Sequence, residues 1–156
     1  MSTMTNKSKT RRIVFVCSGN ICRSPLAEAM AKPMLEERGI PAVVISAGTL
    51  GLQGRSAAAN SVTVAGEVGI DLEGHRSQGV SIPLMRMADH IVVMAPRHEA
   101  ELVGKDRGLT GKIVRLWEYL DEDLDHIPDP VGQDVETFRV MRDRVQEALE
   151  RWIGKL

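Results

Sequence analysis

Cysteine is scarce in this chain of 156 residues, which contains only Cys17 and Cys22. Both lie in one short segment, so no cysteine framework is spread along the chain for disulfides to join. Two thiolates are also too few ligands for a closed zinc site. We expect a cytoplasmic protein, because residues 1–12 lack the pattern of a signal peptide, and the reducing cytosol would keep such thiols free. Because the two thiols share one segment, we also expect them to pair reversibly under oxidation.

An excess of charge of one sign is also missing, as is any long apolar run. The 20 basic and 21 acidic residues leave a net charge of −1, which gives no argument for nucleic acid or an anionic membrane as a partner. No apolar run approaches the roughly 18 residues of a membrane span. Residues 1–12 contain basic residues without an apolar core, so we expect a disordered tail and not a signal peptide. Residues 13–156 are predicted to form one domain.

What the chain does contain, close to its N-terminus, is a strand, a loop and a helix start in direct succession. Residues 13–16 are apolar and mostly β-branched, which is the pattern of a strand buried on both faces. Ser24 and Pro25 favour the N-cap and the first position of a helix. The loop between them, from Cys17 to Arg23, directs backbone N–H groups and the positive end of the helix dipole at its centre. Such a loop is predicted to bind an anion.

The two ends of this loop indicate what the anion is for. A thiolate is stabilised by a helix N-terminus and by cationic groups, which can lower the pKa of a cysteine from about 8.5 to ~3.5. Arg23 presents a planar fork of donors that matches two oxygens of a phosphate. With Cys17 as the nucleophile below such a cradle, the arrangement suits phosphoryl transfer to sulfur. The alternative is a buried structural cysteine beside a glycine-containing turn.

Apolar stretches alternate with helical patterns along the rest of the chain. Strands are predicted at residues 13–16, 42–46, 90–95 and 112–116. Helices are predicted at residues 25–38, from 56 to about 68, 82–87, 96–105, and from Asp134 as N-cap to Gly154. Pro33 is expected to kink or break the first helix, because it removes one backbone hydrogen bond. Continuously apolar strands that alternate with helices indicate an α/β domain, in which ligands bind at the carboxyl ends of parallel strands.

An acidic stretch, residues 121–130, precedes the final helix. Acidic residues in a loop are usually just a solvated surface, but Asp129 lies between Pro128 and Pro130, which stiffen the backbone and fix its direction. A phosphatase needs a proton donor for the leaving oxygen and then a base for the attacking water, and one carboxyl group can do both. His126 is the alternative proton donor.

The segment from Val16 to Pro25 resembles the signature of the low-molecular-weight protein tyrosine phosphatases, especially the bacterial ones. The resemblance continues, in the family's order and spacing, in Ser46-Ala47-Gly48-Thr49, in Gly69-Ile70-Asp71-Leu72 leading to His75, and in Asp129-Pro130. It implies a single three-layer domain with a four-stranded parallel sheet in the order 2-1-3-4. It also implies a metal-independent phosphatase without a cofactor, in which Cys17 attacks phosphorus to form a phosphocysteine intermediate.

The resemblance also implies which residues hold the phosphoryl group and move protons. The phosphoryl oxygens are held by the Arg23 guanidinium and by the loop backbone of Ser18, Gly19, Asn20, Ile21, Cys22 and Arg23. Asp129 protonates the leaving group and then activates water.

Supporting roles are implied for four residues around the loop. Asn20 adopts a left-handed conformation and holds the loop through side-chain hydrogen bonds. Ser24 donates its hydroxyl to the thiolate, in addition to capping the helix. Ser46 and His75 match positions that hydrogen-bond to the asparagine.

The substrate implied is a phosphotyrosyl protein or a small aryl phosphate. Family members that prefer phosphotyrosine usually flank the pocket with aromatic side chains, whereas this chain has Leu50, Leu52 and Val131 there and only 3% aromatic residues. Relatives that act on phosphoarginine tend to carry Thr where this chain has Ile21. Ile21 therefore favours phosphotyrosine, and a protein arginine phosphatase of the same fold is the alternative.

Three further functions are compatible with the fold or the loop. An arsenate reductase of this fold would relay electrons through additional cysteines, which this chain lacks. A phosphocysteine carrier, like the sugar-transport subunits of this topology, would need the cysteine but not Arg23 together with Asp129. A non-enzymatic phosphopeptide-binding module would lose the nucleophile or the acid, and both are present. None of these patterns sets the oligomeric state.

Overall fold

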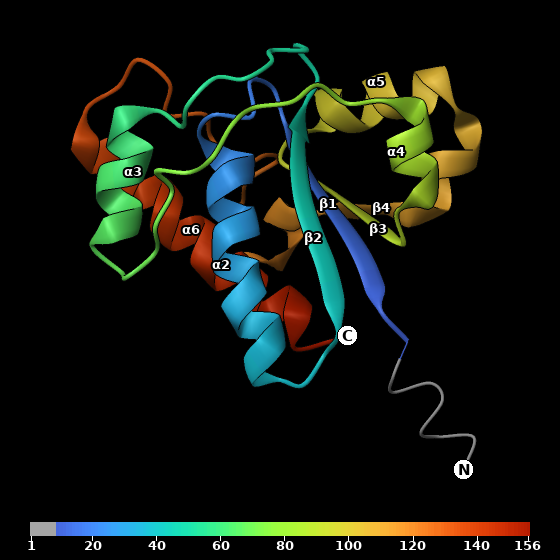
Figure 1. The fold of residues 1–156 in the computed structure, drawn as a ribbon, viewed down its shortest axis with the longest axis horizontal. Helices are drawn as coiled ribbons and strands as arrows, with labels where there is room; N and C mark the ends of the chain where they lie inside the picture. Colours follow the sequence, from blue (N-terminus) through green and yellow to red (C-terminus); the bar gives the residue numbers. More distant parts are fainter. Residues whose placement is uncertain (1–8) are drawn as a thin grey trace.

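The computed structural model describes residues 9–156 (Figure 1). Most of the tail expected at residues 1–12 therefore lies outside the described residues. The first strand begins at Arg11 and not at Ile13, because the backbone of Arg11 and Arg12 already pairs with Ala42 and Val43 of the second strand. Backbone pairing extends the strand beyond the apolar run by which the sequence marks it.

Four parallel strands form one sheet in the order β2-β1-β3-β4, as predicted. They are β1 (Arg11–Cys17), β2 (Ala42–Gly48), β3 (His90–Val93) and β4 (Ile113–Arg115). The central strand is β1, and Ile13 pairs with Val44 on one side and with His90 on the other. Helices cover both faces of this strand, which explains why its apolar run is continuous.

Helices lie on both faces of the sheet, as Figure 1 shows. One face is covered by α2 (Arg23–Glu37), α3 (Ala59–Gly66) and α6 (Val135–Ile153), and the other by α4 (Ile82–Met87) and α5 (Pro96–Lys105). Two 3₁₀ segments that the sequence did not predict, η1 (Arg107–Lys112) and η2 (Leu116–Tyr119), flank β4. The arrangement is the predicted three-layer α/β domain. No helix in residues 9–156 combines the length and apolar character that crossing a membrane requires.

The start and the middle of α2 differ from the prediction. The helix begins at Arg23 with Cys22 as its N-cap, so the assignment of Ser24 as N-cap is wrong. The Ser24 hydroxyl instead contacts Cys17 and Asn20, in the loop of residues 17–23. The helix also runs past Pro33 to Glu37 without a break. Pro33 lies on the exposed side of α2, where water can bind the carbonyl group that loses its backbone partner.

The start of α3 is also later than predicted, at Ala59 and not at Ser56. The preceding residue, Ala58, is extended, and its N–H donates to the carbonyl of Ile21 in the loop of residues 17–23 at 2.9 Å. This contact holds residues 56–58 against the loop and out of the helix. The predicted start of α6 is confirmed, because the Asp134 side chain accepts a hydrogen bond from the N–H of Thr137 at 3.0 Å.

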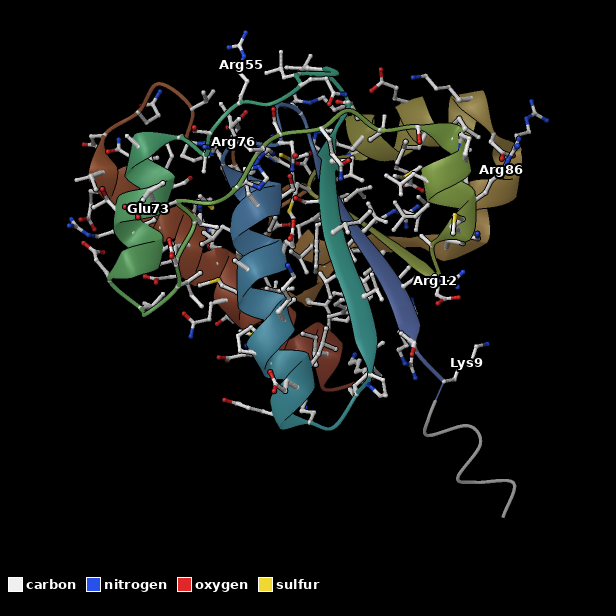
Figure 2. The ribbon with its side chains drawn as sticks, viewed as in Figure 1. Lys9, Arg12, Arg55, Glu73, Arg76 and Arg86 are labelled. Atoms are coloured by element: carbon white, nitrogen blue, oxygen red, sulfur yellow. The ribbon has the colours of Figure 1, made fainter. Side chains whose placement is uncertain are left out.

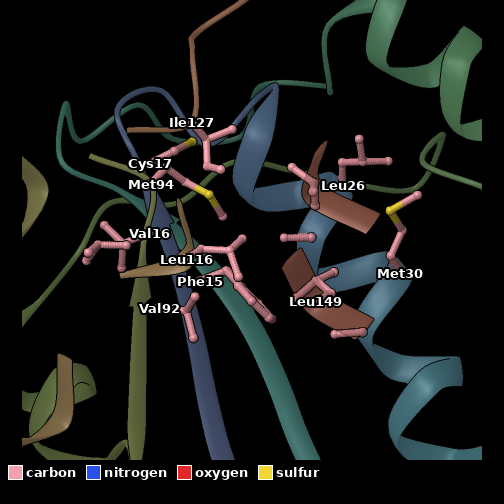
Figure 3. Close-up of a cluster of buried hydrophobic side chains, with 14 of the residues drawn as sticks. Phe15, Val16, Cys17, Leu26, Met30, Val92, Met94, Leu116, Ile127 and Leu149 are labelled. Atoms are coloured by element: carbon pink, nitrogen blue, oxygen red, sulfur yellow. The ribbon is translucent and has the colours of Figure 1, made fainter. Parts of the chain in front are cut away.

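The hydrophobic core between the sheet and α2 with α6 is built mainly from aliphatic side chains (Figure 3). Its aromatic contact is between Phe15 and Trp152, whose rings meet edge to face with centroids 6.2 Å apart. Cys17 lies at one end of this cluster, where the core meets the loop that follows β1 (Figure 3). The core therefore fixes the base of the site.

Candidate active site

The carboxyl ends of the four parallel strands lie on the same side of the sheet, and Cys17 is the last residue of the central strand β1. Its side chain is 2% exposed and belongs to the apolar core. Burying a charged sulfur without hydrogen bonds would be costly, so the polar groups of the following loop decide whether a thiolate can exist there.

Two groups donate to the Cys17 sulfur. The Ser24 hydroxyl oxygen lies 2.9 Å from Sγ, and the backbone nitrogen of Asn20 lies 3.3 Å from it. The direction of the Ser24 hydrogen follows from Asn20, whose Nδ2 donates to Ser24 Oγ at 2.8 Å. Because this oxygen accepts from Asn20, its own hydrogen is free to point at the sulfur. The sulfur is thus surrounded as a thiolate requires.

Asn20 fixes the shape of the loop from its centre. It is fully buried and has a φ of +57°, the left-handed conformation expected for it. Its Nδ2 also donates to Ser46 Oγ at 2.9 Å, and its Oδ1 accepts from the backbone N–H of Gln78 at 3.0 Å. Its carbonyl oxygen accepts a hydrogen bond from His75 Nε2 at 2.7 Å. Neighbours from three segments therefore hold an uncommon backbone conformation in place.

The hydrogen bonds continue from the loop into α2. Ser46 accepts from Asn20 and therefore gives its own hydrogen to Glu28 Oε1, at 2.6 Å. Glu28 Oε2 in turn accepts from Lys32 Nζ at 2.8 Å. Sequence reasoning named Ser46 but missed Glu28 and Gln78, because only the folded chain brings their polar groups to the loop.

Arg23 is buried at the other end of the loop, with 1% of its side chain exposed. Its Nη1 donates to the carbonyl of Ile127 at 2.9 Å, and its Nη2 lies 3.3 Å from Asp129 Oδ2. Its Nε is buried and has no hydrogen-bond partner within the described part of the chain. A bound oxyanion would supply the missing acceptor.

Asp129 reaches the loop through this arginine. Its side chain is 28% exposed. Its Oδ1 accepts a hydrogen bond at 3.1 Å from the backbone N–H of Val131, the residue after Pro130, and this bond fixes the orientation of the carboxyl group. The alternative acid, His126, is 44% exposed and pairs with Asp125 at 2.8 Å. The structure therefore places Asp129 beside Arg23, and His126 on the surface against another carboxylate.

Ser18, which follows Cys17, contacts two arginines and a histidine. Its Oγ lies 3.0 Å from His98 Nε2, 3.3 Å from Arg97 Nη2 and 3.5 Å from Arg23 Nη2. Guanidinium groups only donate, so they occupy the two lone pairs of the hydroxyl, and the Ser18 hydrogen goes to His98 Nε2. This arrangement makes His98 neutral and leaves its hydrogen on Nδ1, a buried atom without a hydrogen-bond partner in residues 9–156. In agreement, burial, followed by the charges of Arg23 and Arg97, lowers the pKa of His98 to about 3.

His98 and Gly48, like Glu28 and Gln78, were not predicted to have a role at the loop. His98 was placed in a helix, and nothing in the local pattern shows that this helix begins beside the loop. Gly48 was only part of a matching motif. In the structure a Cβ on Gly48 would lie 2.7 Å from the Ser18 carbonyl oxygen and 2.9 Å from the Asn20 nitrogen, so only glycine lets the loop backbone pass.

The second cysteine has a different environment from the first. Cys22 is 3% exposed, and burial raises its pKa to about 12, with the charges of Asp129 and Cys17 adding to the effect. Both cysteines are free thiols. Gly19 and Ile21 complete the loop between β1 and α2. Reversible pairing of Cys17 with Cys22 stays a prediction.

A loop of this shape, with a helix N-terminus and a buried guanidinium group around it, is suited to a tetrahedral oxyanion and is typical of phosphate-loop α/β enzymes. Comparison with known sequences identifies one family within this class of enzymes. The family profile described as low molecular weight phosphotyrosine protein phosphatase matches residues 12–156. The chain belongs to this family.

Two kinds of phosphatase are named among the similar proteins, protein-tyrosine phosphatases and protein-arginine phosphatases. The probable low molecular weight protein-tyrosine-phosphatase EpsP of Ralstonia solanacearum is 33% identical, over 94% of this chain and 96% of that one. The protein-arginine-phosphatase of Geobacillus stearothermophilus is 32% identical, over 93% and 95%. The structure of Vibrio vulnificus Wzb in complex with benzylphosphonate superposes with a TM-score of 0.84 at 32% identity, covering 94% of this chain and 99% of that one.

Gly48→Ala should damage the loop and not the fold. The new methyl group would push on the Ser18 carbonyl, and a displacement of about 1 Å at a reacting group can cost roughly 10²-fold in rate. We expect kcat/KM for an aryl phosphate to fall by about that factor, while the urea midpoint changes little. Gly104→Ala in α5 is the matched control, because nothing beyond its chain neighbours and the backbone of its own helix lies within 4 Å of the new methyl group. Equal activity in the two variants would contradict the close approach at Gly48.

His98 should make the stability of the fold depend on pH. The folded protein keeps His98 neutral down to about pH 3, whereas the unfolded chain protonates it near the ordinary pKa of 6.5. Unfolding therefore takes up a proton between these values, and stability falls as the pH falls, by at most about 1.4 kcal/mol per pH unit. Urea unfolding between pH 6 and 4 should show a steeper loss in the wild type than in His98→Gln. Identical slopes would show that His98 titrates alike in both states.

Proposed function

We propose that this chain is a metal-independent protein phosphatase that hydrolyses phosphotyrosine through a phosphocysteine intermediate on Cys17. The supporting observation is the unpartnered Nε of Arg23 in a side chain that is 1% exposed. A buried donor without an acceptor is costly, and a phosphoryl oxygen bound in the loop removes that cost. We place the enzyme in the cytoplasm, because Cys17 and Cys22 are free thiols and the reaction needs the first of them reduced.

In the first step the Cys17 sulfur attacks phosphorus and the bond from phosphorus to the leaving oxygen breaks. The backbone N–H groups of residues 18–23 and the Arg23 guanidinium hold the three equatorial oxygens. Asp129 gives its proton to the leaving oxygen as the bond breaks. The contact of 3.3 Å between Arg23 Nη2 and Asp129 Oδ2 supports this role, because it keeps the acid at the edge of the phosphate site.

In the second step water attacks the phosphocysteine and the sulfur leaves as a thiolate. Asp129, now ionised, takes a proton from the water, and inorganic phosphate departs. The Ser24 hydroxyl at 2.9 Å donates to the sulfur as its negative charge returns. This hydrogen bond is stronger to the thiolate than to the phosphorylated sulfur, so it assists the step.

The rim of the site supports an aromatic substrate. Leu50 is 67% exposed and Val131 is 54% exposed. Ile21 Cγ1 and Leu52 Cδ1 lie 3.4 Å and 3.8 Å from the position that a Cβ on Gly19 would occupy. Such aliphatic side chains pack against the face of a phenyl ring but offer no acceptor to the guanidinium group of phosphoarginine. Arginine phosphatase activity, the second candidate, is supported by the names of two of the relatives.

Cys17→Ser should abolish turnover and keep phosphate binding, because a hydroxyl group in this position is far less nucleophilic than a thiolate. A wild-type sample quenched during turnover should carry labelled phosphate on Cys17. The inactive variant then allows the affinities of phosphotyrosyl and phosphoarginyl peptides of the same sequence to be compared by calorimetry. Tighter binding of the phosphoarginyl peptide would favour the second candidate, and substantial turnover by the variant would refute the nucleophile.

Asp129→Asn should slow the enzyme most on substrates with poor leaving groups. A general acid contributes roughly 10²–10⁴-fold, and phenyl phosphate should lose about that much, whereas a nitrophenyl ester should lose less. Asp125→Asn is the matched control, because the Asp125 side chain is 91% exposed and pairs with His126. The measurement is kcat/KM for aryl phosphates of graded leaving-group pKa. If wild type and Asp129→Asn depend on that pKa equally, Asp129 is not the proton donor.

A further inference from the structure

Arg97 is an exposed arginine in the first turn of α5, and its guanidinium group reaches the phosphate loop. Its Nη2 lies 3.3 Å from Ser18 Oγ, the oxygen that Arg23 Nη2 approaches to 3.5 Å. Two guanidinium groups therefore meet at one hydroxyl, one of them buried at 1% exposure and the other on the surface. The catalytic steps use the buried group and leave the exposed one without a role.

Arg97 contacts a side chain of the phosphate loop, which distinguishes it from the other arginines without a carboxylate partner in residues 9–156, which are Arg11, Arg12, Arg38, Arg55, Arg76 and Arg107. Six arginines of residues 9–156 other than Arg23 have a carboxylate within 4.0 Å: Arg86, Arg115, Arg139, Arg142, Arg144 and Arg151. Arg97 has no such partner within these described residues and contacts the Ser18 hydroxyl instead. The side chain of Arg55, by contrast, points away from the body of the protein into solvent (Figure 2).

Ser18 and His98 hold Arg97 in this position. The Ser18 hydrogen is donated to His98 Nε2 at 3.0 Å, so a lone pair of Ser18 Oγ faces Arg97. Because His98 is buried and neutral, it adds no positive charge that would repel the arginine. A guanidinium group has five N–H donors, and this contact uses one of them. The others are free to bind an acceptor next to the phosphate site.

We propose that Arg97 determines specificity by binding a second anionic group of the substrate, a carboxylate beside the phosphoryl group. The substrate class is a phosphotyrosyl segment with an acidic residue next to the phosphotyrosine. This inference rests on the proposed phosphotyrosine phosphatase function. The planar fork of Arg97 matches a carboxylate through two parallel hydrogen bonds, which lysine in its place could not form.

The test compares two phosphotyrosyl peptides that differ only in glutamate or glutamine beside the phosphotyrosine, with a second pair for the other side. Wild type should prefer the glutamate peptide of at least one pair by up to about fivefold in kcat/KM, the range of a solvent-exposed ion pair. The preference should appear in KM, because the contact forms in the ground state as well as in the transition state. Arg97→Gln should reduce it to near one, and Arg97→Lys should keep only part of it.

Arg107→Gln is the matched control, since it removes the same charge from an exposed arginine beyond the far end of α5, a ten-residue helix about 15 Å long. It should keep the wild-type preference. A wild-type preference near one in both pairs, or an unchanged preference in Arg97→Gln, would overturn the role of Arg97 while the phosphatase function stands. Wild-type protein that hydrolyses none of the peptides would overturn the proposed function itself.

Discussion

The geometry of the loop depends on Asn20, a buried residue in a left-handed conformation. Its side chain amide binds Ser24 and Ser46, its Oδ1 binds the backbone of Gln78, and its carbonyl accepts from His75. These partners come from α2, from β2 and from the segment before α4, so the tertiary fold holds the loop open. A preformed site of this kind needs no reorganisation when charge develops during reaction, which is the main source of electrostatic catalysis.

The same asparagine also decides where hydrogens point. Each of its two Nδ2 hydrogens is given to a serine hydroxyl, which leaves the hydrogen of each serine free to be donated onward. Ser24 donates towards the sulfur of Cys17, and Ser46 donates to Glu28. Ser18 likewise accepts hydrogen bonds from Arg23 and Arg97 and donates its own hydrogen to His98. Proton positions in the site are therefore fixed by groups that can only donate.

Apolar runs predicted the four strands, and the rule for parallel sheets predicted the place of Cys17, whereas the strand order followed from the family resemblance alone. Sequence reasoning failed where a residue serves the tertiary structure and not its own segment. Ser24 suits an N-cap by local rules, but Asn20 and the sulfur claim its hydroxyl. His98 and Gly48 carry no local signal, since their partners in the loop are far away along the chain. Such conflicts between local preference and the fold are expected at functional sites.

A net charge of −1 says nothing about this site, because the charges that matter lie within a few ångströms of Ser18 and Cys17. Arg23 is buried and forms an ion pair with Asp129 at 3.3 Å. Arg97 is exposed, contacts Ser18 and has no carboxylate within 4.0 Å among the described residues. Burial strengthens the electrostatic interactions of Arg23, and solvent weakens those of Arg97 with a bound anion. The inner arginine is therefore suited to holding the transferred phosphoryl group. The outer one contributes less binding energy, but it can distinguish one peptide from another by the charge beside the phosphotyrosine.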